Sequence, residues 1–143
     1  MVPVSQLLAA KGAELFRVAP QDPVIDAIRL MADKRVGALL VMQGEQLLGI
    51  VSERDYARKV ILQGRSSRDT PVADIMTPMP LHTVTPSTRA RECMRLMTEQ
   101  RVRHLPVLDG ERVVGVLSIG DLVRVIIEEQ HTEIVQLKQY IAS

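Results

Sequence analysis

The segment GIVSERDYAR, residues 49–58, recurs 66 positions later as GVLSIGDLVR, residues 115–124. Both copies begin with apolar residues typical of a strand and continue into a pattern typical of a helix start. A serine followed three residues later by an acid is the pattern of a capping box, in which the two side chains bind the first free amides of a helix. Each copy therefore predicts a strand that turns directly into a helix.

The same segment also has an interpretation as a ligand site. Free amides and a partial positive charge at the start of a helix suit a phosphate group. The serine hydroxyl could join that phosphate, and the carboxylate could accept hydrogen bonds from both hydroxyls of a ribose. The glycine either lets a ligand approach the backbone closely or is simply packed within the strand. A cap and a ligand site are not exclusive, so the sequence leaves both interpretations open here.

The repetition extends well beyond these ten residues. Residues 18–61 align with residues 84–127 without a gap, and about a third of the aligned positions are identical. Upstream, residues 4–8 resemble residues 72–76 at a slightly larger offset. The chain is therefore predicted to contain two copies of one structural unit.

Each copy predicts the element order strand, helix, strand, strand, helix. A short extended segment ends at a proline in both copies, at residues 17–20 and 83–86. An amphipathic helix follows, with apolar residues at the i, i+3, i+4, i+7 spacing of one buried face: Val24, Ala27, Ile28 and Met31, then Ala90, Cys93, Met94 and Met97. A Gly-Glu turn then joins two apolar strands, and the last helix opens at the serine; the predicted strands are 38–42 with 47–51, and 105–108 with 113–117.

The rest of the chain predicts a linker and a long helix. Glycine, serine and proline between residues 63 and 79 indicate a loop, with one short helical turn around residues 72–76. Residues 123–143 predict a helix whose apolar residues share one stripe: Val123, Ile127, Ile134, Leu137 and Ile141. The predicted fold class is α/β (α+β), with a first repeat at 3–63, a linker at 64–71, a second repeat at 72–128 and a C-terminal helical extension at 129–143.

Composition argues against several classes of protein. The lone Cys93 cannot form an internal disulfide, which suits a reducing, cytoplasmic location. A net charge of +1 and only three aromatic residues argue against nucleic acid as a partner. No apolar run approaches the ~20 residues of a membrane span, and no secretory signal is visible. No catalytic constellation and no cluster with metal-ligand spacing is recognisable, so we expect neither an enzyme nor a metal site.

The repeated unit, with its G-h-h-[ST]-x-x-D ending (h is an apolar residue), resembles a cystathionine-β-synthase (CBS) domain, and the tandem pair resembles a Bateman module. The segment VRHLPV, residues 102–107, is a second marker of the resemblance. The resemblance implies that the two repeats pack with pseudo-twofold symmetry. It also implies that clefts between them bind an adenine nucleotide, namely AMP, ADP, ATP or NAD, with no further cofactor required.

The resemblance also implies which residues bind the nucleotide. Asp55 and Asp121 would bind the ribose hydroxyls, with Ser52 and Ser118 beside them. The phosphate of the Asp55 cleft would face Arg103 and His104, and that of the Asp121 cleft would face Arg54. The adenine would lie against the first and second strands of each repeat, at Arg17, Val18, Ala38, Leu39 and Leu40, and at Thr83, Val84, His104, Leu105 and Pro106. Leu40 departs from the family pattern, in which proline is usual at this position.

The implied function is that of a stand-alone regulatory module, which signals energy or redox state to a protein that the sequence does not identify. The alternative is an oligomerisation or interaction module with vestigial clefts. Isolated pairs of such repeats commonly dimerise, and the apolar stripe of the last helix favours a homodimer. The alternative for that helix is that it folds back onto its own module.

Overall fold

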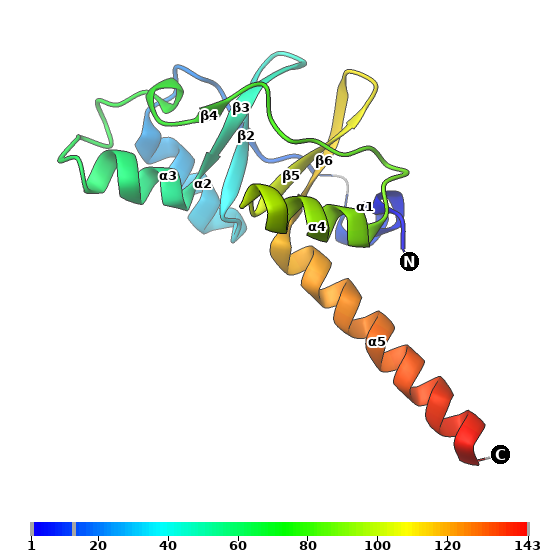
Figure 1. The fold of residues 1–143 in the computed structure, drawn as a ribbon. Helices are drawn as coiled ribbons and strands as arrows, with labels where there is room; N and C mark the ends of the chain where they lie inside the picture. Colours follow the sequence, from blue (N-terminus) through cyan, green and yellow to red (C-terminus); the bar gives the residue numbers. More distant parts are fainter. Residues whose placement is uncertain (1, 13, 143) are drawn as a thin grey trace. The chain divides into compact units, whose positions relative to one another are not determined.

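The computed structural model describes residues 2–12 and 14–142, which form two compact units. The first-repeat unit comprises Glu14–His82, and the second-repeat unit combines Met1–Ala13 with Thr83–Ser143 (Figure 1). Both units contain helices and strands, and their order is the predicted one except at the first strand of the second repeat. The α/β fold class with two repeats is confirmed. The packing units do not follow the order of the chain, because the N-terminal segment belongs with the second repeat.

The first-repeat unit is built on a four-stranded sheet in the order β1-β2-β3-β4. Strand β1 is parallel to β2, and the other pairs are antiparallel. The strands are β1 (Arg17–Val18), β2 (Ala38–Gln43), β3 (Gln46–Ser52) and β4 (Thr77–Pro78). The helical segments are α2 (Val24–Lys34), α3 (Glu53–Tyr56), the π-helical η1 (Ala57–Ile61) and the 3-10 turn η2 (Val72–Asp74). Strand β4 was not predicted from the sequence.

The second-repeat unit has a two-stranded antiparallel sheet and three helices. Its elements are α1 (Val4–Lys11), α4 (Ala90–Gln100), β5 (His104–Asp109), β6 (Arg112–Ser118) and α5 (Ile119–Ala142). The strand predicted at residues 83–86 is wrong: this segment makes only one bridge, between Val84 and Val107. In the first repeat the amide of Leu40 donates to Phe16 at this point. Pro106 occupies the matching position and has no amide hydrogen, so the ladder cannot extend.

The two hairpins share the same irregularities. Each has a shift of register on its first strand, after Val41 in one and after Val107 in the other. Gly44 and Gly110, at the tips, have φ angles of 60° and 65°, a backbone region that glycine adopts without strain. The sequence repeat is thus a repeat of backbone geometry as well.

Helices α2 and α4 bury the faces that the sequence predicts. Val24, Ala27 and Met31 belong to the core of the first-repeat unit, while Ile28 is partly buried against it. In the other unit the matching core residues are Ala90, Cys93 and Met97, with Met94 partly buried. The amphipathic pattern is therefore confirmed in both copies.

The segment that precedes each repeat packs closely against the second hairpin strand of one unit. Leu8 of α1 contacts Gly115 on β6, and Met76 beside β4 contacts Gly49 on β3. A Cβ atom at Gly49 would collide with the carbonyl oxygen of Thr77, and one at Gly115 would lie 2.6 Å from the Leu8 side chain. These glycines therefore serve close packing within the unit, which is the structural interpretation of the motif.

Helix α5 is continuous from the end of β6, so the last helix of the second repeat and the C-terminal helix are one element. Ser143, the last residue of the predicted helix, lies outside the described residues. The predicted apolar stripe is exposed, from 41% at Val123 to 74% at Ile141, so this face of α5 does not pack against its own unit. None of the described helices is long and apolar enough to cross a membrane.

The thiol of Cys93 offers a direct test of the second-repeat core. Cys93 is fully buried. This burial, and to a smaller extent the negative charge of Glu92, raises the pKa of the Cys93 thiol to about 11. We expect the folded protein to react with a thiol reagent such as DTNB at pH 8 only as fast as the unit opens, because the thiolate is the reactive form. The unfolded protein should react at once. Rapid reaction of the folded protein would contradict the packing of α4.

Candidate functional site

Ser52 and Asp55 form the predicted capping box where β3 turns into α3. The amide of Ser52 donates to Asp55 Oδ2 at 2.9 Å, and the amide of Asp55 donates to Ser52 Oγ at 3.2 Å. The Ser52 hydroxyl also donates to Oδ2, at 3.1 Å. The carboxylate is thereby held at one orientation at the start of the helix.

The second repeat reproduces this geometry where β6 turns into α5. The amide of Ser118 donates to Asp121 Oδ2 at 2.9 Å, and the amide of Asp121 donates to Ser118 Oγ at 3.2 Å. The capping interpretation of the motif is therefore confirmed in both copies.

Capping and strand contacts use most of the amides that the sequence suggested for a phosphate. The two amides of each box are already bound. A third amide, that of Glu53, donates to the carbonyl oxygen of Gly37 at 3.0 Å. Ile119 donates to the carbonyl oxygen of Arg103 at 2.9 Å in the same way. The expectation of free amides at these helix starts is therefore wrong for three amides in each repeat. A ligand here would depend on side chains instead.

Each capping serine lies directly across the hairpin from the start of the strand before it. Ser52 is opposite Ala38, and Ser118 is opposite His104. The structure thus brings the predicted ribose residues and the first residue of the predicted strand wall together within each unit. The other predicted wall residues whose side chains are buried are Val18, Leu39, Leu40, Val84, Leu105 and Pro106.

Three predicted residues lie at the surface of their units. Arg54 is exposed on α3, and Arg103 is exposed before β5. Arg17 is also exposed, and its guanidinium donates to the carbonyl oxygen of Gly44 at 2.9 Å, at the hairpin tip. Thr83 is half-buried beside the single bridge of Val84. The clefts between the repeats remain a prediction from the resemblance.

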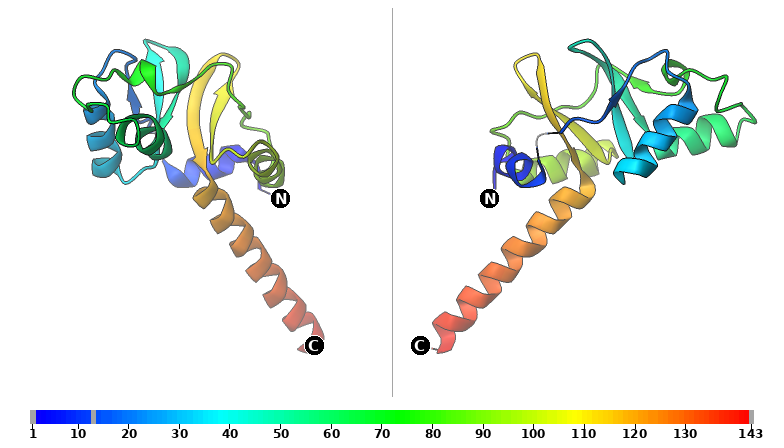
Figure 2. Two further views of the ribbon diagram at one scale, coloured as in Figure 1. Left: turned by 60° about the vertical axis from the view of Figure 1, so that its left-hand side comes forward. Right: turned by 180° about the vertical axis from the view of Figure 1, so that it is seen from behind.

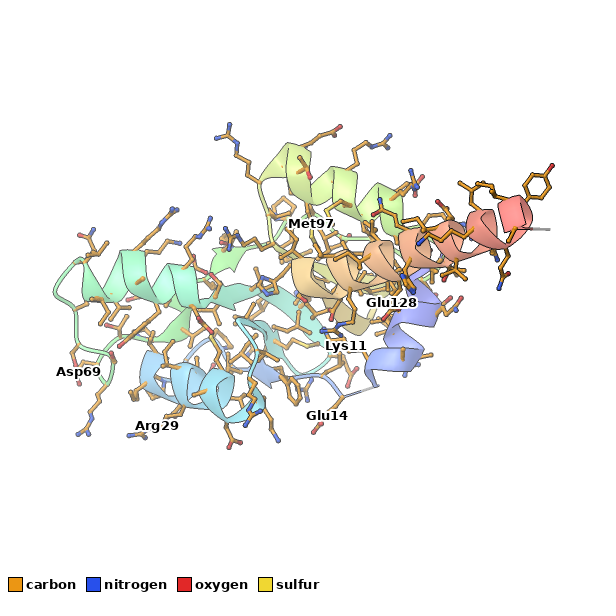
Figure 3. The ribbon with its side chains drawn as sticks, turned by 90° about the horizontal axis from the view of Figure 1, so that it is seen from below. Lys11, Glu14, Arg29, Asp69, Met97 and Glu128 are labelled. Carbon is orange, nitrogen blue, oxygen red and sulfur yellow. The ribbon has the colours of Figure 1, made fainter. Side chains whose placement is uncertain are left out.

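Each of the two aspartates forms an ion pair with a lysine, and neither pair was predicted from the sequence. Lys59 Nζ lies 3.3 Å from Asp55 Oδ1, one helical turn further along the chain. Lys11 lies at the end of α1 (Figure 3). Its Nζ donates to Asp121 Oδ2 and to the carbonyl oxygen of Val116, both at 2.8 Å. The i, i+4 spacing of Asp55 and Lys59 could have revealed the first pair. The second joins residues 110 positions apart, and no local pattern could reveal it.

Lys11 shapes the electrostatics of the second site. Burial alone would raise the pKa of Asp121, but hydrogen bonds from Lys11 and from the Ser118 amide outweigh it and hold the pKa below its ordinary value. Burial, and then the charge of Lys11, lower the pKa of His104. The neutral form of His104 is thereby favoured, which weakens the basic pair predicted at Arg103 and His104.

The structure also has a cavity of about 420 Å³ between α1 and α5. It is lined partly by Glu128, Glu129 and Glu133, whose charges disfavour a phosphate, and by none of the predicted nucleotide-binding residues. Within residues 2–12 and 14–142, no group of three histidine, cysteine or acidic side chains is placed to hold a metal ion.

Two segments of the chain, residues 12–61 and 72–128, match the family model of the CBS domain. The chain therefore belongs to the CBS domain family, and the resemblance seen in the sequence is confirmed. One capping box lies near the end of each matched segment.

The relatives share most of the length of this chain. It is 49% identical over 137 residues to the mitochondrial CBS domain-containing protein CBSX3 of Arabidopsis thaliana, and the match covers 93% of this chain and 66% of that protein. A structure from Burkholderia ambifaria, described as a signal-transduction protein with CBS domains, is 53% identical with a TM-score of 0.86, covering 90% of this chain and 96% of that one. The CBS domain protein PAE2072 from Pyrobaculum aerophilum, complexed with AMP, is 26% identical with a TM-score of 0.78, covering 92% and 99%.

Substituting Lys11 tests the electrostatics of the second site. In Lys11→Met we expect the pKa values of both Asp121 and His104 to rise, because a nearby positive charge is lost. The Asp121 contribution to stability is present above the ordinary value of 3.8 and is lost as the pH falls through the lower folded value. The variant should therefore lose less stability in acid than the parent.

NMR titration of the two side chains measures these changes, and Lys11→Arg, which keeps the charge, is the control. Unchanged pKa values in Lys11→Met would show that the lysine does not contact Asp121 in solution.

Proposed function

We propose that this chain is a regulatory module that binds an adenine nucleotide at Asp55 and Asp121 and signals the occupancy of these sites to another protein. The CBS family is generally non-catalytic, and we propose no reaction for this member. The proposed ligand is AMP, ADP, ATP or NAD. The proposed location is cytoplasmic, as the lone cysteine suggested.

One observation carries the proposal. Both repeats place a fixed carboxylate and a serine hydroxyl beside the first residue of the neighbouring strand, with nearly the same hydrogen-bond lengths. A cap alone requires no such match between copies, since other residues can also cap a helix. The AMP complex of the relative from Pyrobaculum aerophilum supports an adenine nucleotide as the ligand class.

The carboxylates have acceptor capacity left for a ribose. The cap uses Oδ2 of each aspartate, and a carboxylate can accept about four hydrogen bonds in all. Asp121 Oδ1 has no hydrogen bond to any described residue, and Asp55 Oδ1 has only the contact with Lys59. Ribose hydroxyls could therefore bind Oδ1 without opening the cap.

The lysines provide the observation that favours the alternative function. Each carboxylate already has a cation within 3.3 Å, so neither site needs a ligand to balance its charge. An oligomerisation or interaction module with vestigial clefts would retain the boxes for stability alone. We propose a homodimer under either function.

Neutralising both aspartates tests the ribose role. We expect the parent to bind an adenine nucleotide in the micromolar range, about −8 kcal/mol. The double variant Asp55→Asn, Asp121→Asn should weaken binding roughly ten- to hundredfold per site, because each charge-assisted hydrogen bond contributes about 1.5–3 kcal/mol. Calorimetry with AMP, ADP, ATP, NAD and S-adenosylmethionine measures both effects.

Asparagine is preferred to alanine because its side-chain oxygen can still accept the hydrogen bond from the serine amide, whereas alanine would remove that bond. Glu53→Gln is the matched control, since this exposed acid lies in the same turn as Asp55 but outside the box. If the double variant binds as tightly as the parent, the ribose role is wrong. If the parent binds none of the five ligands, the interaction module becomes the better account.

A further inference from the structure

Helix α5 has two different apolar faces, and only one of them packs against its own unit. Leu122 is fully buried, and Val125 packs against the same core. A second face carries Val123, Ile127, Gln130, Ile134, Leu137 and Ile141, which we call the α5 seam. Its five apolar residues are 41%, 59%, 52%, 59% and 74% exposed in chain order, and Gln130 is exposed too.

The seam follows the spacing of a coiled coil. Its members are separated by four, three, four, three and four residues, which is the alternation of a heptad repeat. This spacing places Ile127, Ile134 and Ile141 at the a positions and Val123, Gln130 and Leu137 at the d positions. Among parallel coiled coils, isoleucine at a with leucine at d favours two strands, and Leu137 is the leucine at one of the three d positions.

The second half of α5 has an exposed surface. All described residues from Gln130 onward are exposed, and both views of Figure 2 show the helix continuing well beyond β5 and β6. A single helix of this kind gains little stability in water, because most helical stability in proteins comes from packing an apolar face. We therefore expect another apolar surface to pack against the seam along its length.

We propose that this partner is a second copy of the chain, and that the two α5 helices form a parallel two-stranded coiled coil along the seam. The proposal deepens the homodimer proposed above and does not depend on nucleotide binding. It is carried by the charges beside the seam and by Gln130.

The flanking charges are complementary only in the parallel arrangement. Glu133 is at a g position and Lys138 at the e position five residues later, so in a parallel pair each Glu133 faces the other copy's lysine. In the antiparallel pairing that matches a with d layers over the whole seam, Glu133 faces Glu133. Arg124 then faces Lys138. Like charges on both flanks disfavour that orientation.

Gln130 specifies the same orientation and register. In the parallel pair the two Gln130 side chains face each other in one layer and can exchange a hydrogen bond, as a single polar core residue does when it fixes register. In the antiparallel pair each Gln130 faces Ile134. A shift of the parallel pair by one heptad would place one Gln130 against Leu137 and the other against Val123. Either alternative buries an amide without a partner, at a cost of about 1–3 kcal/mol.

A pair of adjacent substitutions in the full chain tests the seam. Without added nucleotide, sedimentation equilibrium should find the parent to be a dimer, and Ile134→Asp should raise the dissociation constant at least a hundredfold. The matched control is Val135→Asp, because Val135 is exposed on the same turn but lies off the seam. Val135→Asp should remain a dimer. A monomeric parent, or equal effects of the two substitutions, would overturn the proposed interface.

Cross-linking tests the orientation. In a Cys93→Ala background, Gln130→Cys places two thiols in one layer of a parallel pair, and mild oxidation should link most chains at this position. The control is Val135→Cys, which should not cross-link because it points away from the seam. Failure of Gln130→Cys to cross-link while the dimer persists would overturn the parallel register. Because no nucleotide is present, neither result bears on the ligand proposal.

Discussion

The capping box at the end of each hairpin is the interaction on which the rest of the structure depends. It joins the last strand of a repeat to the helix that follows, and the next amide, of Glu53 or Ile119, ties that helix start to the residue before the neighbouring strand. The box thereby fixes the direction in which each helix leaves its sheet. The box also uses Oδ2 of each aspartate, so a ligand would bind the other carboxylate oxygen, Oδ1.

Much of this arrangement could be predicted from the sequence, because it is local. The amphipathic faces of α2 and α4, the hairpins and the serine–aspartate boxes all depend on residues close together in the chain, and the 66-residue repeat presents each of these patterns twice. The sequence also contains the reason why the first strand of the second repeat is reduced to one bridge. Proline at position 106, where the first copy has Leu40, already removes the amide that such a strand needs.

The rest could not be predicted, because it depends on contacts between distant segments. Nothing near Asp121 in the sequence indicates that Lys11 approaches it, and the second repeat has Val125 where the first has Lys59. The packing of α1 with the second repeat likewise depends on which unit the N-terminal segment joins. Each carboxylate thus has a lysine partner, but the two lysines are not at equivalent positions of the repeats.

The lysine of the second site also connects two elements. Lys11 joins the end of α1 to the edge of β6 through Val116 and to the first turn of α5 through Asp121. A hydroxyl bound to Oδ1 would share this carboxylate with the lysine, which is bound to Oδ2. A ligand can therefore alter the contact between α1 and α5 only as far as it weakens or displaces the lysine. The consequence would reach along the helix, because α5 contains no proline and no glycine beyond Gly120. The seam begins at Val123, two residues after Asp121, so the capping box and the exposed apolar stripe belong to one stiff element. A change in the contacts of the first turn of α5 would therefore change the orientation of the seam relative to the rest of the unit.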